Sequence, residues 1–104
     1  MTQTTQAVLR ALLDRRSEDV YGLEICGATG LPSGTVHPIL ARFEALGWLA
    51  SSWEEVDPRE KGRPRRRYYR LTADGAALAS DALAKAYQAR TRIITRLRPA
   101  GELS

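Results

Sequence analysis

The 104-residue sequence predicts a mainly α-helical protein with one β-hairpin, arranged as a winged helix-turn-helix followed by a long C-terminal helix. Three observations predict this fold class. Three short helical segments come first, and a tight turn containing Gly30 joins the last two of them. A strand, a basic tip and a returning strand come next. A single helical pattern of about 25 residues then closes the sequence.

Apolar residues at helical spacing predict the first three helices, over about residues 4–16, 21–29 and 33–46. Gly30 can adopt the left-handed conformation that often follows a helix, and Pro32 cannot continue one. The second and third helices therefore form the helix-turn-helix, and the third is expected to be the recognition helix.

The predicted recognition helix has one apolar face and one small, polar face. Ser33 is a good N-cap for it, and Gly47 is expected to end it. Side chains on the outer face are small and uncharged near the N-terminal end, so this face can approach a flat polar surface closely. The outer face consists of Gly34, Pro38, Ala41 and Ala45, flanked by Thr35, His37 and Arg42.

A two-stranded hairpin with a basic tip is predicted after the third helix. Residues 48–55 and 65–71 read as the strands, and residues 56–64 as the turn or long tip between them. Tyr69 and Leu71 are expected on the core face of the returning strand. Basic residues crowd residues 59–70, which contain only one acid, Glu60: they are Arg59, Lys61, Arg63, Arg65, Arg66, Arg67 and Arg70.

The last predicted helix begins after Thr72, which is expected to cap it, and covers about residues 73–97. We expect three parts in the chain: a DNA-binding domain over 1–72, a dimerisation helix over 73–98 and a flexible tail over 99–104. A stripe on the helix would lie open to water in one chain, and such stripes usually mark interfaces. The expected dimer contacts are Leu83, Ala86, Tyr87, Arg90, Ile93, Ile94 and Leu97. The competing possibility is that this stripe folds back on the first helix.

Composition argues against several other classes of protein. A single cysteine, Cys26, and a single histidine, His37, cannot form a tetrahedral metal site without distant carboxylates. Neither a Gly-rich phosphate loop nor a plausible nucleophile–base pair is present, so we expect no enzyme activity and no cofactor. No apolar run approaches the ~20 residues that span a bilayer, and the N-terminus lacks signal-peptide features. The interpretation is a cytoplasmic protein that does not bind a membrane, with a net charge of +4.

Two segments together resemble the PadR-type transcriptional regulators. They are "YGLEICGATGLPSGTVHPILARFEALGWLASSWEE" and "GRPRRRYYRLTADG", which cover most of residues 21–75. The family has a Tyr-Gly-x-Glu-Ile opening of the second helix, a Gly-Thr-Leu-Tyr-Pro-x-Leu recognition segment and a Gly-Arg-Pro-Arg-Arg-x-Tyr-x-Leu-Thr wing. His37 stands where the family usually has tyrosine, and Val36 where it has leucine. With one C-terminal helix, the chain is similar to the shorter branch of the family.

The resemblance implies a sequence-specific DNA-binding transcriptional regulator, expected to be a homodimeric repressor that binds an inverted-repeat operator in double-stranded DNA. The alternative is a winged-helix module that binds a protein partner without specific DNA binding; an RNA binder or an enzyme is favoured less. Some relatives bind a flat aromatic effector between subunits, but the last helix has Tyr87 and no Trp, so that site is not carried over. The expected DNA-binding residues are Ser33, Gly34, Thr35, His37, Pro38, Arg42, Lys61, Arg63, Arg65 and Arg66.

Overall fold

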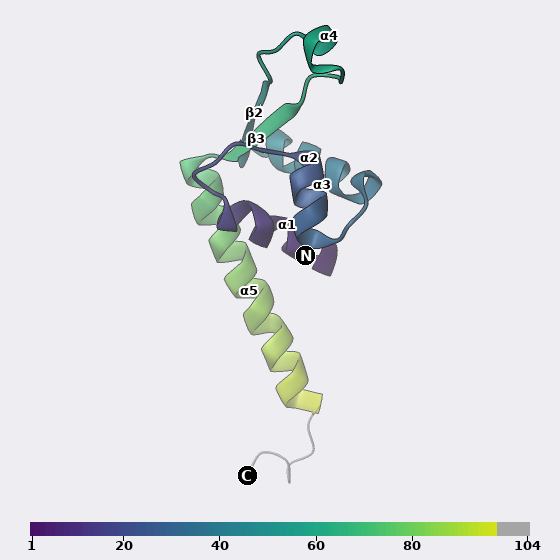
Figure 1. Ribbon diagram of the computed structural model, residues 1–104. Helices are drawn as coiled ribbons and strands as arrows, with labels where there is room; N and C mark the ends of the chain where they lie inside the picture. The colour runs from purple at the N-terminus through teal and green to yellow at the C-terminus, as the bar shows by residue number, and fades with distance from the viewer. Residues whose placement is uncertain (98–104) are drawn as a thin grey trace.

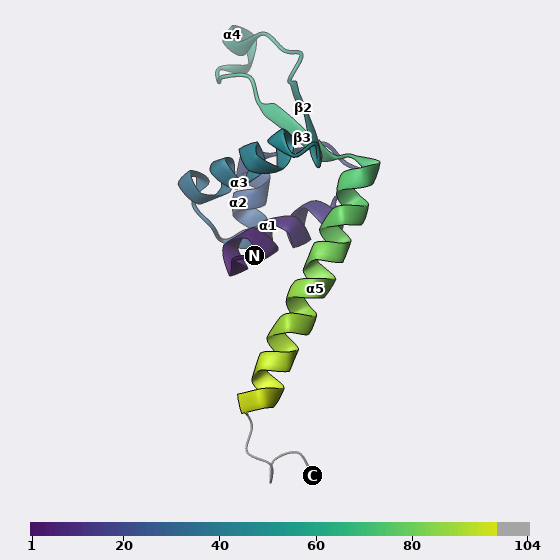
Figure 2. The same cartoon turned by 180° about the vertical axis from the view of Figure 1, so that it is seen from behind.

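The computed structural model describes residues 1–97 and confirms the predicted fold class (Figure 1). The expected tail over 99–104 lies outside the described residues. A helical body is flanked by a hairpin that projects on one side and a long helix that projects on the other (Figure 2). The elements are α1 (Gln3–Asp14), β1 (Val20–Tyr21), α2 (Gly22–Thr29), α3 (Ser33–Ala45), β2 (Leu49–Trp53), α4 (Pro58–Lys61), β3 (Arg67–Leu71) and α5 (Ala73–Leu97).

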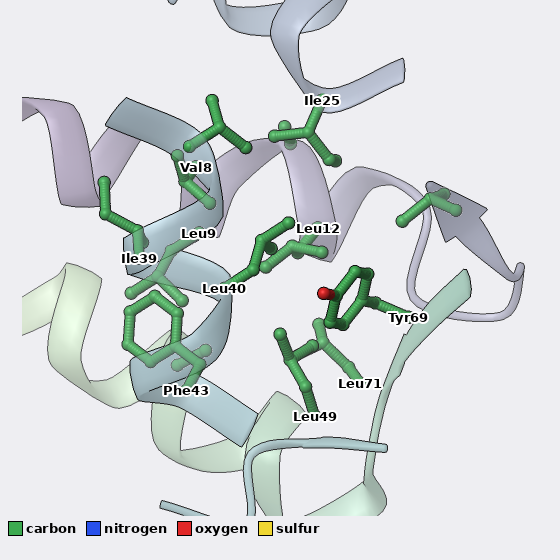
Figure 3. Packing of buried hydrophobic residues seen from close by; sticks show 14 residues of the cluster. Val8, Leu9, Leu12, Ile25, Ile39, Leu40, Phe43, Leu49, Tyr69 and Leu71 are labelled. Carbon is green, nitrogen blue, oxygen red and sulfur yellow. The ribbon is translucent and has the colours of Figure 1, made fainter. Parts of the chain in front are cut away.

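One hydrophobic core joins α1, α2 and α3 to the sheet and to the start of α5 (Figure 3). The apolar face of each helix supplies it, because residues three and four positions apart lie on the same side of a helix. Burial of these side chains is the main favourable contribution to folding. The core residues are Val8, Leu9, Ala11, Leu12, Val20, Ile25, Val36, Ile39, Leu40, Phe43, Leu49, Tyr69, Leu71 and Ala79.

The sheet has three antiparallel strands in the order β1-β3-β2, so the expectation of a two-stranded hairpin was incomplete. Leu49 pairs with Leu71 at the base of the hairpin, and Val20 pairs with Tyr69 on the other side of β3. The alternation expected for β3 is confirmed, since Tyr69 and Leu71 are buried and Arg70 is exposed. β1 has two residues and therefore no periodicity that a sequence could reveal; only its pairing with β3 defines it.

The ends of the helices differ from expectation at Ser33. Pro32, not Ser33, occupies the N-cap position of α3, with an extended backbone (φ −73°, ψ 156°), and no side chain caps the helix. The pyrrolidine ring fixes φ near this value, which suits the residue that leads into a helix. Gly30 (φ 73°) adopts the left-handed conformation expected of it, and Gly47, which was expected to end α3, adopts the same conformation (φ 79°).

The hairpin, which we call the wing (residues 49–71), carries a short helix at its tip. α4 was not expected, since the tip was predicted as a turn. Asp57 caps α4 by accepting a hydrogen bond from the backbone N–H of Arg59 at 2.9 Å, Pro58 takes the first helical position, and Gly62 ends it at φ 67°. These residue types favour a helical start and stop even over four residues.

α5 spans the predicted 25 residues and leaves the body after its first turns. Thr72 caps it, because its hydroxyl accepts a hydrogen bond from the backbone N–H of Gly75 at 2.9 Å. The radius of gyration of 17.3 Å exceeds the ~13 Å typical of a compact chain of this length, in keeping with an extended helix. Within residues 1–97, no helix combines the length and apolar character needed to cross a bilayer.

Candidate nucleic-acid interface

The outer face of α3 is open to solvent along its N-terminal half. Ser33, Gly34, His37 and Pro38 are exposed there, and Thr35 is half-buried. This face has no charged side chain until Arg42, which is also exposed one turn further on. The small side chains allow the helix backbone to approach the floor of a DNA groove, while Thr35 and His37 offer hydrogen-bonding groups to base edges.

His37 reaches from α3 towards the start of α2 and the base of the wing. Its side chain lines a hollow whose walls are largely apolar and come from β1, α2, α3 and β3. The recognition helix and the wing therefore lie side by side at this hollow. The sequence pattern alone could not predict this arrangement. Its other lining residues are Tyr21, Gly22, Leu23, Arg66, Arg67 and Tyr69.

Among the wing cations expected to bind DNA, Lys61 and Arg65 are exposed and available to a partner. Lys61 ends α4, and Arg65 follows in the descending part of the tip. The Nε atom of Arg65 donates a hydrogen bond to the carbonyl oxygen of Val56 at 2.9 Å, which orients the guanidinium. Neither cation has an ion-pair partner among the described residues. Such groups can neutralise phosphates without first breaking an internal ion pair.

Arg63 is in a different position, because it forms a two-pronged ion pair with Glu54. Its Nη1 and Nη2 atoms lie 2.7 and 3.0 Å from the two carboxylate oxygens, and the Glu54 side chain is only 12% exposed. Glu54 also accepts the backbone N–H of Arg66 at 3.2 Å. The hydrogen bonds from Arg63 lower the pKa of Glu54 from 4.5 to about 2, against the opposing effect of burial. The pair thus fastens the two strands of the wing together below its tip.

Arg66 lies against aromatic rings at the base of the wing. Its guanidinium carbon is 4.1 Å from the centroid of the Tyr21 ring, and the Tyr21 and Tyr68 rings meet edge to face at 5.7 Å. A cation over an aromatic face is attracted by the ring quadrupole. Arg66 is therefore half-buried and held on the outer face of the sheet, close to the hollow that contains His37.

A further polar cluster, which the sequence did not reveal, ties α3 to both strands of the wing. Nη2 of Arg67 donates to the two Glu44 oxygens at 3.1 and 3.0 Å and to Ser51 Oγ at 2.9 Å, and Ser51 Oγ donates to Glu44. The hydrogen bond from Ser51, followed by that from Arg67, lowers the pKa of Glu44. Nε of Arg67 is buried and has no partner among the described residues. The cluster fixes the wing relative to the recognition helix.

The residues expected at a dimer interface divide into three groups. Leu83 is half-buried and packs against the core of its own chain, and Ala86 is half-buried in a groove between α1 and α5. Tyr87, Arg90 and Ile93 are exposed, with Tyr87 70% and Ile93 57% accessible. Arg90 and Ile93 line the same groove, so fold-back on α1, the competing possibility, brings part of the stripe beside α1 but leaves Tyr87, Arg90 and Ile93 exposed. The side chains of Ile94 and Leu97 lie outside the described residues.

The chain has relatives among known proteins. Bordetella bronchiseptica BpsR, described for the regulation of its DNA binding by 6-hydroxynicotinic acid, superposes with a TM-score of 0.68 at 27% identity over 99% of this chain and 68% of that one. A PadR family regulator from Eggerthella lenta superposes with a TM-score of 0.72 at 24% identity over 88% of this chain and 80% of that one. Another PadR family regulator, from Clostridium difficile, superposes with a TM-score of 0.67 at 21% identity over 91% of this chain and 97% of that one.

No curated protein sequence matches the chain. The model of the transcriptional regulator PadR-like family, in contrast, matches residues 8–81, a span that runs from the middle of α1 through the wing and into α5. It includes the exposed face of α3 and the whole wing. The chain belongs to the transcriptional regulator PadR-like family.

Proposed function

We propose that this protein is a sequence-specific DNA-binding repressor that acts as a homodimer on an inverted-repeat operator. The observation that carries the proposal is the shared hollow, which both His37 of α3 and Arg66 at the base of the wing line. It puts a helix face that suits base edges next to a hairpin that suits phosphates. Base contacts determine sequence preference, whereas phosphate contacts determine affinity and register.

In this proposal the two halves of the surface have different tasks. Residues of the exposed α3 face, chiefly Thr35 and His37, read bases in the major groove. Lys61 and Arg65 bind phosphates from the wing tip, because they are exposed and have no internal ion pair. Arg63 contributes mainly by keeping the Glu54 carboxylate neutralised, so that the tip presents net positive charge to the DNA.

The wing assignment is tested by the salt dependence of duplex binding. Each neutralised phosphate contributes about −0.9 to the slope of log K against log salt. Arg65→Ala is therefore expected to flatten the slope by about 0.9 and to weaken binding to all duplexes alike. Arg10→Ala is the matched control, since it removes the same charge from an exposed position on α1. Equal slopes for the Arg65 variant and wild type would refute the wing assignment, and a slope near zero for wild type would favour a protein partner instead.

The homodimer is proposed to form through the projecting part of α5. Tyr87 and Ile93 are large apolar residues that one chain leaves exposed, and a second copy of the same helix could cover them. A two-fold dimer would place two recognition helices about 34 Å apart, or a multiple of that, along one face of the duplex. An inverted-repeat operator follows from this symmetry.

Sedimentation velocity at tens of micromolar tests the dimer. Tyr87→Glu is expected to yield monomers, because it puts a charge at the centre of the apolar stripe, while Gln88→Glu adds the same charge one position away and should leave the dimer intact. Wild-type protein that remains monomeric defeats the proposal. A truncation that removes the proposed dimer surface should begin after Lys85, because Ala79 is fully buried and Leu83 packs on the core of its own chain. We thus retain the division into a DNA-binding domain (1–72) and a dimerisation helix (73–98) as a functional proposal, although the two parts share one core.

A further inference from the structure

Gly22, the first residue of α2, is buried directly beneath the side chain of His37. A Cβ atom built on Gly22 would come closer to Cε1 of His37 than the 3.0 Å below which real Cβ contacts essentially do not occur, and it would lie 3.1 Å from both Nδ1 and Nε2. The three nearest atoms all belong to the imidazole. The ring therefore points its Cε1 corner at the backbone of Gly22.

The backbone of Gly22 does not itself require glycine. The glycines with positive φ are Gly30, Gly47 and Gly62, and Gly22 is not among them, so any L-residue could adopt its conformation. The space above its Cα is what a side chain would fill. Gly27, five residues along the same helix, meets nothing within 4 Å and shows that close approach is not general to α2.

We propose that Gly22 is a positioning residue for His37 and, through it, for the sequence preference of the recognition helix. The inference rests on the proposed DNA-binding function and deepens it. Gly22 lines the hollow together with Tyr21, Leu23 and Arg66, and the His37 side chain, which lies against Gly22, stays exposed to solvent. An imidazole supported on one side and open on the other loses less rotamer freedom when it binds a base edge.

Substitution of Gly22 should disturb the imidazole and leave the fold intact. The atom that a new Cβ would meet lies at the far end of the His37 side chain, which can swing away by rotating about its own bonds. In Gly22→Ala the ring is thus displaced from the position that α2 otherwise gives it. Gly27→Ala is the matched control, because it adds the same methyl group to the same helix where space is open.

His37 is the only histidine of the chain, so its ring protons can be observed singly by proton NMR. In free wild-type protein we expect a nuclear Overhauser effect between the Cε1 proton of His37 and the α-protons of Gly22. Gly22→Ala should shift the Cε1 proton resonance, and Gly27→Ala should not. An unchanged His37 resonance in Gly22→Ala would overturn the assignment whatever the DNA result, since this measurement contains no DNA.

DNA binding completes the test with a double-mutant cycle. The probes are a duplex selected from a random library by the wild-type protein and a scrambled duplex of the same composition, both at one salt concentration. Gly22→Ala is expected to lower the ratio of the affinity for the selected duplex to that for the scrambled duplex by at least about fivefold. This factor is the lower end of the range expected when one base contact is lost. The scrambled duplex should bind as before, because no phosphate contact has changed.

The His37→Ala background separates positioning from a general effect. If Gly22 acts through His37, Gly22→Ala should have no further effect on selectivity once the imidazole is absent. The positioning role is overturned if Gly22→Ala lowers selectivity equally in the wild-type and His37→Ala backgrounds. It is also overturned if Gly22→Ala is as selective as a selective wild type. Both outcomes leave the proposed function standing. A wild-type protein that prefers no sequence over scrambled DNA overturns the proposed function, and the positioning role with it.

Discussion

Gly75 lies in the first turn of α5, where the helix passes directly over the backbone of Trp48. A Cβ atom at this position would lie 2.7 Å from the carbonyl carbon and from Cα of Trp48, and closer still to the carbonyl oxygen. Carbon atoms normally pack at ~3.5–4.0 Å, so the overlap approaches 1 Å. The atoms that would be struck are backbone, and the same carbonyl accepts hydrogen bonds from Thr72 N at 3.0 Å and from Thr72 Oγ1 at 3.3 Å. It cannot retreat without loosening the start of α5.

The expected cost of Gly75→Ala follows from two opposing effects. Overpacking of a tight contact costs about 1–3 kcal/mol, and the better helix propensity of alanine returns up to ~1 kcal/mol. With the full return of ~1 kcal/mol, we expect a net loss of stability of about 0–2 kcal/mol, which at ~4–8 °C per kcal/mol lowers Tm by up to about 8–16 °C. Gly27→Ala, in open space on α2, isolates the propensity effect and should stabilise by ~0.4–1 kcal/mol.

Thermal unfolding followed by far-ultraviolet circular dichroism measures both variants, at one chain concentration because dimerisation would make Tm depend on it. Gly75→Val should unfold at a lower temperature than Gly75→Ala, since a larger side chain deepens the overlap. If Gly75→Ala were as stable as Gly27→Ala, the close passage of α5 over Trp48 would be refuted. Opposite signs for the two alanine variants would support it.

Three further predictions concern the wing and the core. The pKa of Glu54 is depressed to about 2 in the folded protein, so its ion pair contributes stability that is fully present above pH ~4.5 and is lost as pH falls towards 2. The difference in Tm between wild type and Glu54→Gln should therefore shrink as pH falls over this range. A constant difference would argue against the pair. Arg63→Ala leaves the Glu54 carboxylate unpaired beside the DNA, so it should weaken duplex binding more than Arg65→Ala does. Adding Glu54→Gln to Arg63→Ala should restore part of the affinity. No restoration would mean that Arg63 contacts the phosphates directly. Phe43 is 5% exposed and stacks on Trp48, with the two ring centroids 5.1 Å apart. Phe43→Ala is expected to lower the free energy of unfolding, measured in urea, by about 3–5 kcal/mol. A loss below ~1 kcal/mol would contradict the place of Phe43 in the core.

Much of the architecture follows from local sequence patterns. The helical repeat that places Val8 and Leu12 on one face recurs in the structure as the buried side of α1, and the alternation of Tyr69 and Leu71 recurs as the core face of β3. Each pattern repeats over several residues, and its physical cause is the fixed geometry of a helix or strand. The exposure of His37 and the positive φ of Gly30 follow in the same way from position within an element. The family match confirms the family resemblance, whereas the DNA-binding roles that the resemblance implies for these positions stay predictions.

Contacts between distant segments were decided only by the tertiary structure. The Glu54–Arg63 pair spans nine residues and the Glu44–Arg67 pair spans 23, and a run of basic residues does not indicate which arginine turns inward and which remains exposed. β1 exists through its pairing with β3 alone. Gly22 and His37 lie 15 positions apart, and their contact depends on how α2 crosses α3. Periodicity encodes which face of an element is buried, whereas the partner of each side chain depends on the angles at which those faces pack, and these are set by the core as a whole.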